Sequence, residues 1–186
     1  MILLVRHGEA DGTQLDSEGW WGPARDFAPL SARGVQQAKE AGRRLRDCGA
    51  DRIIASPMTR ALQTAALISA ETQLPLTAVD VDLREWLPDN TLTWRSTEAL
   101  AAAEERTRYD GSWPPGESRT WEPHTSVRRR ALDALRRHST GTPFIAVCHS
   151  VVIETLTGTR GIEHCGVHPF TLADAAHPPD EVFLPR

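Results

Sequence analysis

The sequence has few cysteines, no long apolar run and no excess of positive charge. Its three cysteines, Cys48, Cys148 and Cys165, form no C-x-x-C pair, which excludes a disulfide framework and suits a reducing compartment. The net charge of -4 gives no general reason to expect nucleic acid or an anionic membrane as partner. The apolar run at residues 1–5 is too short for a signal peptide, and no stretch approaches the ~20 apolar residues of a membrane span. We therefore expect a cytoplasmic protein with no nucleic-acid or membrane partner.

The chain length, 186 residues, fits one domain better than two. A chain of this size buries roughly 70% of its unfolded surface, so it can fold without a disulfide or a structural metal. The sequence leaves the oligomeric state open, and a homo-oligomer is compatible with it.

Short apolar runs alternate along the chain with segments of helical periodicity. Strands are predicted at residues 2–5, 53–55, 76–79 and 144–148, and helices at 31–48, 58–71, 97–108, 127–135 and 150–156. Residues 8–30 are rich in glycine and proline and predict a long loop, while the last residues predict one or two edge strands and a proline-rich tail. The alternation predicts an α/β fold, a three-layer sandwich with a mostly parallel central sheet and helices on both faces. We expect a single domain over residues 1–186, with residues 86–121 as a small lid-like insertion.

Polar clusters follow three of the predicted strands. Arg6 and His7 come after the first strand, the segment from Ser56 to Arg60 after the second, and His149 after the strand at 144–148. In mostly parallel sheets, ligands bind beyond the carboxyl ends of the strands. The three clusters are therefore expected to meet at one edge of the sheet.

The residue types in these clusters suit a phosphate group. A neutral imidazole such as that of His7 can attack phosphorus, and the planar guanidinium of Arg6 matches phosphate oxygens. Arg60 is predicted in the first turn of a helix, where free N–H groups and the helix dipole favour an anion. Each residue also has an ordinary interpretation: His7 as a cap at a strand end, the arginines in surface ion pairs, and His149 as a core histidine.

The motifs together resemble the histidine phosphatase superfamily, also called phosphoglycerate-mutase-like. The resemblance extends in order from residue 2 to about residue 172. Its motifs are Arg6-His7-Gly8-Glu9, Pro29-Leu30-Ser31-x-x-Gly34-x-x-Gln37-Ala38, Ser56-Pro57-x-x-Arg60-Ala61-x-Gln63-Thr64, Leu83-Arg84-Glu85, Gly116-Glu117-Ser118 and Val147-x-His149.

The resemblance implies a role for each matching residue. His7 would accept a phosphoryl group from a small-molecule phosphate monoester, and Arg6 and Arg60 would bind its oxygens. His149, protonated in the complex, would stabilise the equatorial oxygens, and Glu85 would protonate the leaving oxygen and then activate water. Neither a metal nor an organic cofactor would be needed.

Glu85 is chosen over two other acidic possibilities. One branch of the family carries an Asp directly after the second histidine, where this chain has Ser150, and Glu9 is usually a supporting residue in the family. The chain also departs from the family at Ala10, Thr13 and Ser150. Thr13 and Ser150 are predicted to bind the phosphate, and the departures suggest altered packing around it.

Other features are given less weight. The segment Glu163-His164-Cys165-x-x-His168 has residue types that suit zinc, but its spacing matches no standard site, so we predict no metal. The arginines at 128–130 and 136–137 are interpreted as the solvated face of a helix. Four of the six tryptophans lie within residues 86–121, where they line a pocket or simply pack.

Several functions remain open. The first is a phosphatase, and its main alternative is a phosphoglycerate-type mutase, which in this family is usually longer and carries a lid. The others are a phosphate-binding module without turnover and a relative recruited to non-phosphatase chemistry. The sequence does not identify the substrate.

Overall fold

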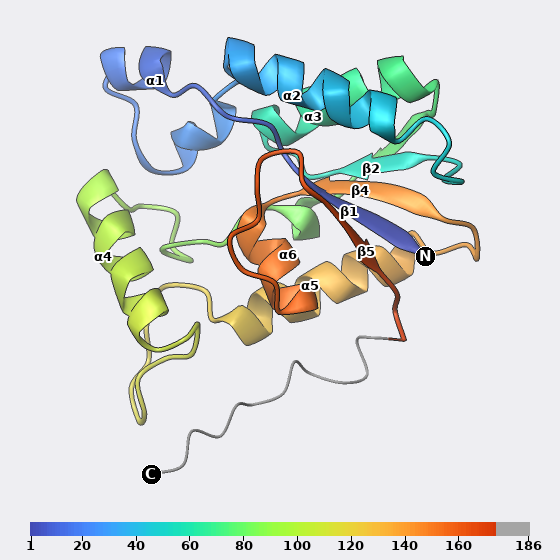
Figure 1. Ribbon diagram of the computed structural model, residues 1–186. Coiled ribbons are helices and arrows are strands. Elements are labelled where there is room, and N and C mark those ends of the chain that lie inside the picture. The colour runs from blue at the N-terminus through green and yellow to red at the C-terminus, as the bar shows by residue number, and fades with distance from the viewer. Residues whose placement is uncertain (174–186) are drawn as a thin grey trace.

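A five-stranded sheet forms the centre of the molecule in the computed structural model, which describes residues 1–173 (Figure 1). Its strands are β1 (Ile2–Arg6), β2 (Ile53–Ala55), β3 (Leu76–Val79), β4 (Phe144–Cys148) and β5 (Val167–Phe170), in the order β3-β2-β4-β1-β5. The first four are parallel to one another, and β5 runs antiparallel to β1. All four predicted strands are confirmed, and β5 is the predicted edge strand. The proline-rich tail lies outside the described residues from 174 onward.

Two helical layers cover the sheet. Helices α2 (Ala32–Arg44) and α3 (Thr59–Thr72) pack on one face, and α5 (His124–Arg137) and α6 (Ser150–Thr157) on the other (Figure 1). The predicted three-layer α/β sandwich with a mostly parallel sheet is therefore confirmed. No helix within residues 1–173 is long and apolar enough to cross a membrane.

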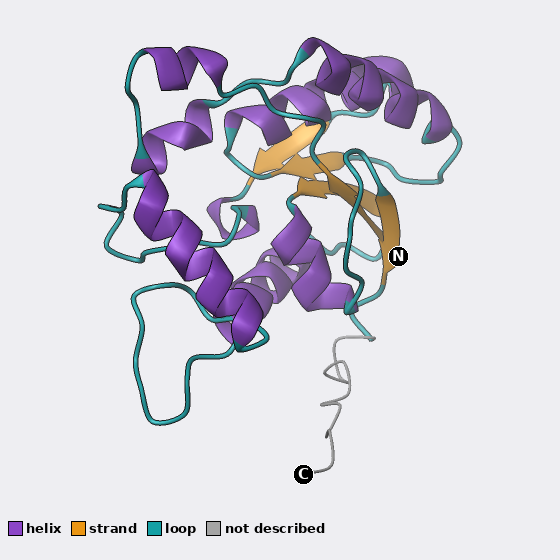
Figure 2. Cartoon of the chain, turned by 60° about the vertical axis from the view of Figure 1, so that its left-hand side comes forward, coloured by secondary structure: helices purple, strands orange, loops and turns teal. Residues whose placement is uncertain are grey.

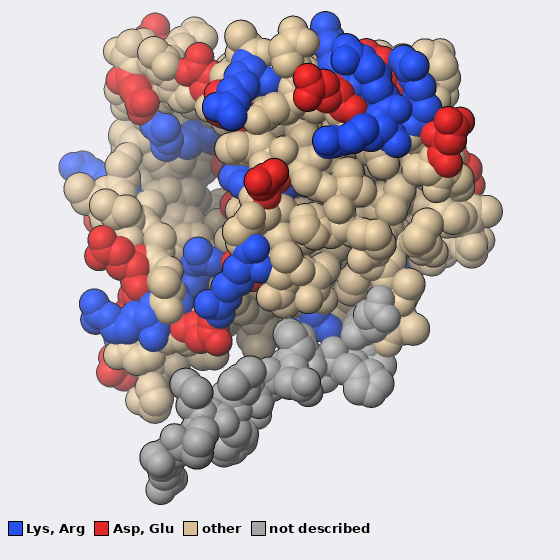
Figure 3. Space-filling model, viewed as in Figure 1, with Lys and Arg blue, Asp and Glu red and all other residues tan. Residues whose placement is uncertain are grey.

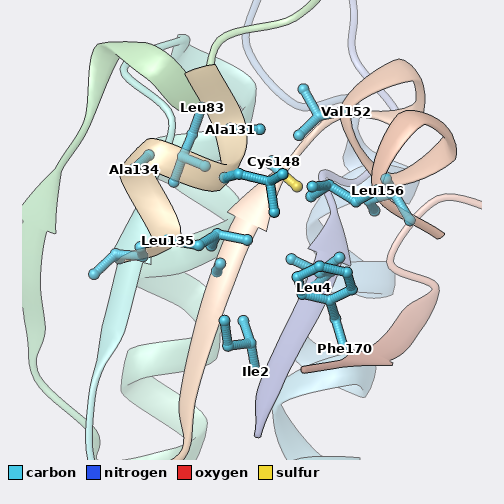
Figure 4. Close-up of a cluster of buried hydrophobic side chains, with 14 of the residues drawn as sticks. Ile2, Leu4, Leu83, Ala131, Ala134, Leu135, Cys148, Val152, Leu156 and Phe170 are labelled. Atoms are coloured by element: carbon cyan, nitrogen blue, oxygen red, sulfur yellow. The ribbon is translucent and has the colours of Figure 1, made fainter. Parts of the chain in front are cut away.

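Alternation of apolar side chains along the strands explains why both faces are covered. Along β1, Leu4 packs with Leu135 and Phe170 in the cluster beneath α5 and α6 (Figure 4). The neighbouring residues Leu3 and Val5 belong to the opposite cluster beneath α2 and α3. Because successive side chains of a strand point to opposite faces, a continuous apolar run is buried on both sides.

The segment at 8–30 contains more structure than the predicted loop. It holds a short helix, α1 (Thr13–Ser17), and a 3₁₀ turn, η1 (Gly22–Phe27), and it is tied back by an isolated bridge between Ala10 and Leu30. The prediction of an unbroken loop is wrong because helices of one or two turns leave no recognisable periodicity. Neither element has a side-chain hydrogen bond at its N-cap, so the usual sequence signal for a helix start is also missing.

Helix boundaries follow local signals where those signals exist. Ser31 caps α2 as predicted, since its hydroxyl accepts a hydrogen bond from the N–H of Gly34. The helix ends at Arg44, before the predicted stop at Gly49, although Gly49 does adopt a positive φ. The other four predicted helices are confirmed within a few residues.

The segment 86–121 extends to one side of the sandwich (Figures 1 and 2). It follows a 3₁₀ turn, η2 (Val81–Leu83), and contains α4 (Ser96–Arg108), none of whose residues is buried. Trp94 and Trp121 are buried, so they hold the segment together by packing. Its function as a lid remains a prediction.

Candidate active site

Three strand ends and one helix start meet at a single edge of the sheet. His7 follows β1, Ser56 follows β2, His149 follows β4, and Arg60 lies in the first turn of α3. The imidazole rings of His7 and His149 are 5.0 Å apart between centroids. The Nε of Arg60 donates to Nε2 of His7 at 3.3 Å, and Nε2 of His149 is 2.8 Å from the hydroxyl of Ser56. Residues separated by up to 142 positions in sequence are thereby brought into one cluster.

Close backbone packing fixes the chain directly after His7. The N–H of Gly8 donates to the Thr64 hydroxyl at 3.0 Å, and that hydroxyl donates to the carbonyl of Arg60 at 2.7 Å. A Cβ at Gly8 would lie 2.6 Å from the carbonyl oxygen of Gly34, and a Cβ at Gly34 only 2.1 Å from that of Glu9. Glycine is required at both positions because no side chain fits between these backbones.

The hydrogen bonding of His7 leaves its Nε2 as the nucleophilic atom. Nδ1 lies 2.7 Å from the carbonyl oxygen of Gly8, and a carbonyl can only accept, so Nδ1 carries the proton. Nε2 therefore carries no proton, and its lone pair accepts the hydrogen bond from Nε of Arg60. Burial, and next the positive charge of Arg60, lower the pKa of His7 to about 3. The ring, only 7% exposed, is neutral at any physiological pH.

Two arginines supply positive charge without forming an ion pair in the described chain, although Glu85 lies near enough to both, and Asp26 near enough to Arg60, to act on their pKa. Within residues 1–173, neither Arg6 nor Arg60 has an acidic partner within 4.0 Å. Arg6 is held by the carbonyl of Ile162, and its Nε is buried without a hydrogen-bond partner. Nη2 of Arg60 contacts the Met58 sulfur at 3.1 Å. Guanidiniums without a direct ion-pair partner at a strand edge are suited to binding an anion.

His149 is completely buried and neutral in the free site. Burial first, and then the charge of Arg60, lower its pKa far below the ordinary value. Its Nδ1 has no hydrogen-bond partner among the described residues. A bound dianion would favour the protonated ring, because opposite charges nearby stabilise the charged form. Protonation of His149 in a complex stays a prediction.

Glu85 lies beside the two arginines in the turn after η2. Its carboxylate accepts two hydrogen bonds, one from the backbone N–H of Trp86 at 2.9 Å and one from the Ser150 hydroxyl at 3.3 Å. Burial raises its pKa, against the opposing effects of the Trp86 hydrogen bond and of Arg60 and Arg106. A raised pKa favours the protonated carboxyl that a general acid needs.

An ion pair that the sequence did not predict holds this turn in place. Arg130 is 8% exposed and binds Glu122, 2% exposed, through two hydrogen bonds of 2.7 and 2.9 Å. The same guanidinium donates to the carbonyls of Asp82, Arg84 and Glu85. The interpretation of residues 128–130 as a solvated face is thus wrong for Arg130. Local spacing gave no signal, because its partners lie 8 to 48 positions away.

His164 lies in the segment that the sequence analysis weighed as a zinc site or a turn near the active site, and the structure places it on such a turn. Its ring lies 5.8 Å from that of His7 between centroids, on the turn before β5. Burial, and then the charge of Arg6, lower its pKa. Within residues 1–173, no three His, Cys, Asp or Glu side chains are grouped closely enough to hold a metal ion. The turn is held against the site by its next residue, Cys165, whose N–H donates to the carbonyl of Arg6.

The remaining predicted residues lie at different distances from the cluster. Ser150 opens α6 and donates to Glu85, so its hydroxyl contacts the acid. Thr13 is exposed in α1, and both its N–H and its hydroxyl donate to Asp11; in the described chain no hydrogen bond joins it to the cluster. Glu9 accepts from the Ser31 hydroxyl at the start of α2, which is a supporting contact. Phosphate binding by Thr13 and Ser150 stays a prediction.

The fold and this cluster define a class of protein. A neutral, buried imidazole flanked by unpaired guanidiniums, at the carboxyl edge of a mostly parallel sheet, is suited to phosphoryl transfer, which depends mainly on positioning and positive charge.

The family model for the histidine phosphatase superfamily (branch 1) matches residues 2–175, so the chain belongs to that superfamily. A probable phosphoglycerate mutase, GpmB, of Enterobacter sp. (strain 638) is 33% identical over 165 residues, 85% of this chain and 73% of the relative. An uncharacterized phosphatase, PhoE, of Bacillus subtilis (strain 168) is 30% identical over 157 residues, 83% of this chain and 74% of the relative. A mycobacterial glucosyl-3-phosphoglycerate phosphatase, solved with VO3, shares the fold with a TM-score of 0.65 at 21% identity, covering 88% of this chain and 89% of that one.

Proposed function

We propose that the protein hydrolyses a small-molecule phosphate monoester through a phosphohistidine intermediate on His7. The observation that carries the proposal is the state of His7: the Gly8 carbonyl holds the Nδ1 proton, so Nε2 is unprotonated and accepts a hydrogen bond from Arg60, which has no ion-pair partner in the described chain. A phosphate group that displaces the hydrogen bond between Nε2 and Arg60 would meet a nucleophile and the guanidiniums of Arg6 and Arg60.

In the first step, Nε2 of His7 attacks phosphorus while the bond to the leaving oxygen breaks. Arg6, Arg60 and His149 stabilise the charge on the three equatorial oxygens. The carboxyl of Glu85 gives its proton to the leaving oxygen, because an alkoxide is a poor leaving group. The products are an alcohol, the phosphohistidine and the Glu85 carboxylate.

In the second step, water attacks the phosphohistidine. The Glu85 carboxylate accepts a proton from that water, the P–N bond breaks, and its electron pair returns to Nε2 of His7. Inorganic phosphate leaves, and Glu85 is again protonated. The Nδ1 proton stays on the ring throughout, bonded to the Gly8 carbonyl, and the scheme uses no metal or organic cofactor.

A screen of phosphate metabolites and aryl phosphates tests the proposal. We expect His7→Ala to lower turnover by roughly 10⁴-fold or more, as loss of a covalent nucleophile does in other enzymes. His168→Ala, on the edge strand β5, is the matched control and should keep wild-type rates. A radiolabelled ester should also leave an acid-labile phosphoenzyme on the wild type and none on His7→Ala. Near wild-type rates for His7→Ala would show that His7 is not the nucleophile.

A mutase is the second candidate, because the relative at 33% identity is described as a probable phosphoglycerate mutase. Incubation with 3-phosphoglycerate separates the two activities: a phosphatase releases inorganic phosphate and glycerate, whereas a mutase forms the isomeric phosphoglycerate. Release of phosphate without isomerisation supports hydrolysis. A folded wild type that turns over no ester would instead favour a binding module or non-phosphatase chemistry.

A further inference from the structure

Three buried side-chain atoms in residues 1–173 are polar and have no hydrogen-bond partner. Two of them, Nε of Arg6 and Nδ1 of His149, belong to the phosphate site described above. The third is Nε of Arg106, in the last turn of α4. Buried polar groups without partners are rare and costly, and at a binding site they mark places that a ligand fills.

The charge of Arg106 is also unpaired. In the described chain no carboxylate lies within 4.0 Å of its guanidinium, the same condition as for Arg6 and Arg60. Nearby arginines differ, since Arg119 binds Glu105 of α4 and Arg160 binds both Asp110 and Glu154. The acidic side chains around α4 are thus engaged elsewhere, and the positive charge of Arg106 remains available.

Two rigid neighbours fix the position of Arg106. Its guanidinium carbon lies 4.8 Å from the centre of the Trp86 ring, and Nη1 lies 3.1 Å from Nε2 of His124. His124 is itself held by Gly111, whose carbonyl accepts its N–H at 2.8 Å. Burial, and next the charge of Arg106, lower the pKa of His124 to about 4, so the ring is neutral and accepts this hydrogen bond. These contacts orient the guanidinium and leave its charge uncompensated.

Arg106 lies on the side of the site where the leaving group must be. Trp86, beneath its guanidinium, directly follows Glu85, the proposed donor to the leaving oxygen. The charge of Arg106 is also among the causes that act on the pKa of Glu85. A cavity of about 170 Å³ adjoins it, lined also by His124, by Arg160 and by the two carboxylates that pair with Arg160, those of Asp110 and Glu154. Figure 3 shows the molecule hollowed between the α4 side and the body, with basic and acidic side chains at the margins.

We infer that Arg106 binds a second anionic group, a carboxylate or a second phosphate, on the alcohol portion of the substrate. The inference rests on the proposed function, because Glu85 defines where the leaving group lies. Nε and Nη2 of Arg106 have no hydrogen-bond partner among residues 1–173, and these two parallel donors match such a group once the substrate opens the packing that buries Nε. The preferred substrates are therefore esters with two anionic groups.

Two pairs of esters test the inference. Glycerol 3-phosphate and 3-phosphoglycerate differ by a carboxylate, and fructose 6-phosphate and fructose 1,6-bisphosphate differ by a phosphate. We expect the wild type to favour the more anionic ester of at least one pair by about tenfold in kcat/KM, as a charge-assisted hydrogen bond provides. Arg106→Gln should bring this ratio close to 1, and Arg106→Lys should keep part of it. Arg108→Gln, exposed on the same helix, is the control and should leave the ratio unchanged.

The ratio of kcat/KM within a pair distinguishes binding of the second anionic group from an effect of Arg106 on Glu85. An effect on Glu85 would slow both esters of a pair equally. Equal loss for both esters in Arg106→Gln, or no wild-type preference in either pair, would overturn the inference. Calorimetric binding of the same esters to His7→Ala, with and without Arg106→Gln, gives the ratio without turnover. If the wild type hydrolyses nothing, the proposed function fails, and the binding ratio still decides the role of Arg106.

Discussion

The edge of the sheet and the segment 86–121 hold their functional side chains in different ways. At the sheet edge, His7 and His149 are buried, and their backbones continue the parallel pairing of β1 with β4, as in the bond from the N–H of His7 to the carbonyl of Cys148. In the segment, α4 buries none of its residues, and Arg106 is held by one ring on each side. The sheet edge is rigid because its residues belong to the core.

Glu85 lies at the junction of these two regions. Glu122 joins the end of the segment to its start through two hydrogen bonds: its N–H donates to the carbonyl of Leu87, and its carbonyl accepts from the indole of Trp86. The carboxylate of Glu122 binds Arg130 of α5. The proposed acid is therefore anchored to the core by Arg130 on one side and continues into the less buried segment on the other. This arrangement indicates that chemistry depends on the sheet edge and selectivity on the segment.

The largest expected effect at the junction follows from Glu85→Gln. An amide cannot supply the proton, so turnover of alkyl phosphates should fall by roughly 10²- to 10⁴-fold. Turnover of p-nitrophenyl phosphate should fall much less, since its leaving group needs little protonation. In the wild type, kcat for alkyl esters should decline as pH rises through the raised pKa of Glu85, and this decline should be absent in the variant.

Steady-state rates for alkyl and aryl phosphates over a range of pH measure both the dependence on leaving group and the decline with pH. Glu9→Gln is the control: Glu9 follows β1 and accepts a hydrogen bond from Ser31, the N-cap of α2, so this variant should keep the dependence on leaving group. An equal loss for alkyl and aryl esters in Glu85→Gln would assign the acid to another residue.

The next largest effect is expected on stability, when the ion pair between Arg130 and Glu122 is broken. Arg130→Met leaves Glu122 as a buried charge, with only Arg84 at 3.8 Å as a weak partner. The free energy of unfolding should fall by about 3 kcal/mol, the lower end of what loss of one partner of a buried ion pair costs. Urea denaturation measures the change.

The double variant Arg130→Met/Glu122→Leu removes both charges and should regain most of the loss, because the uncompensated charge causes it. Arg129→Met, exposed on the same helix, should change stability little. A single variant as stable as the wild type would contradict the role of the pair as the anchor.

The smallest effect is expected on the exposed face of α4. Leu100 is 63% exposed, and Leu100→Ser should change the free energy of unfolding by less than about 0.5 kcal/mol. Leu4→Ser in β1, fully buried, is the contrasting substitution and should prevent stable folding or come close to it. A large loss at Leu100 would mean that α4 is covered by a partner or a second copy of the chain.

Much of the fold followed from local patterns. The strand at 144–148 was predicted with its observed ends because five apolar residues stand between a Thr-Pro pair and a polar cluster. The Ser31 cap was predicted because its hydroxyl acts on an N–H only three residues away. The short elements α1 and η1 were missed, since elements of five or six residues show no periodicity and these two lack capping contacts.

The sequence by itself determined the layers of the molecule and the chemical types at the sheet edge. Alternating runs of strand and helix specify which faces are buried, and each parallel strand delivers the residue that follows it to the same edge. Only the tertiary structure decided which charges are compensated. Arg130, predicted on a solvated face, is buried and paired with Glu122, and Arg106, for which the sequence holds no signal, has a buried Nε without a partner in the described chain. His164, weighed as a zinc ligand or part of a turn near the site, lies beside His7. The reason is that burial and hydrogen-bond partners depend on elements far apart in sequence, which meet only when the chain is packed.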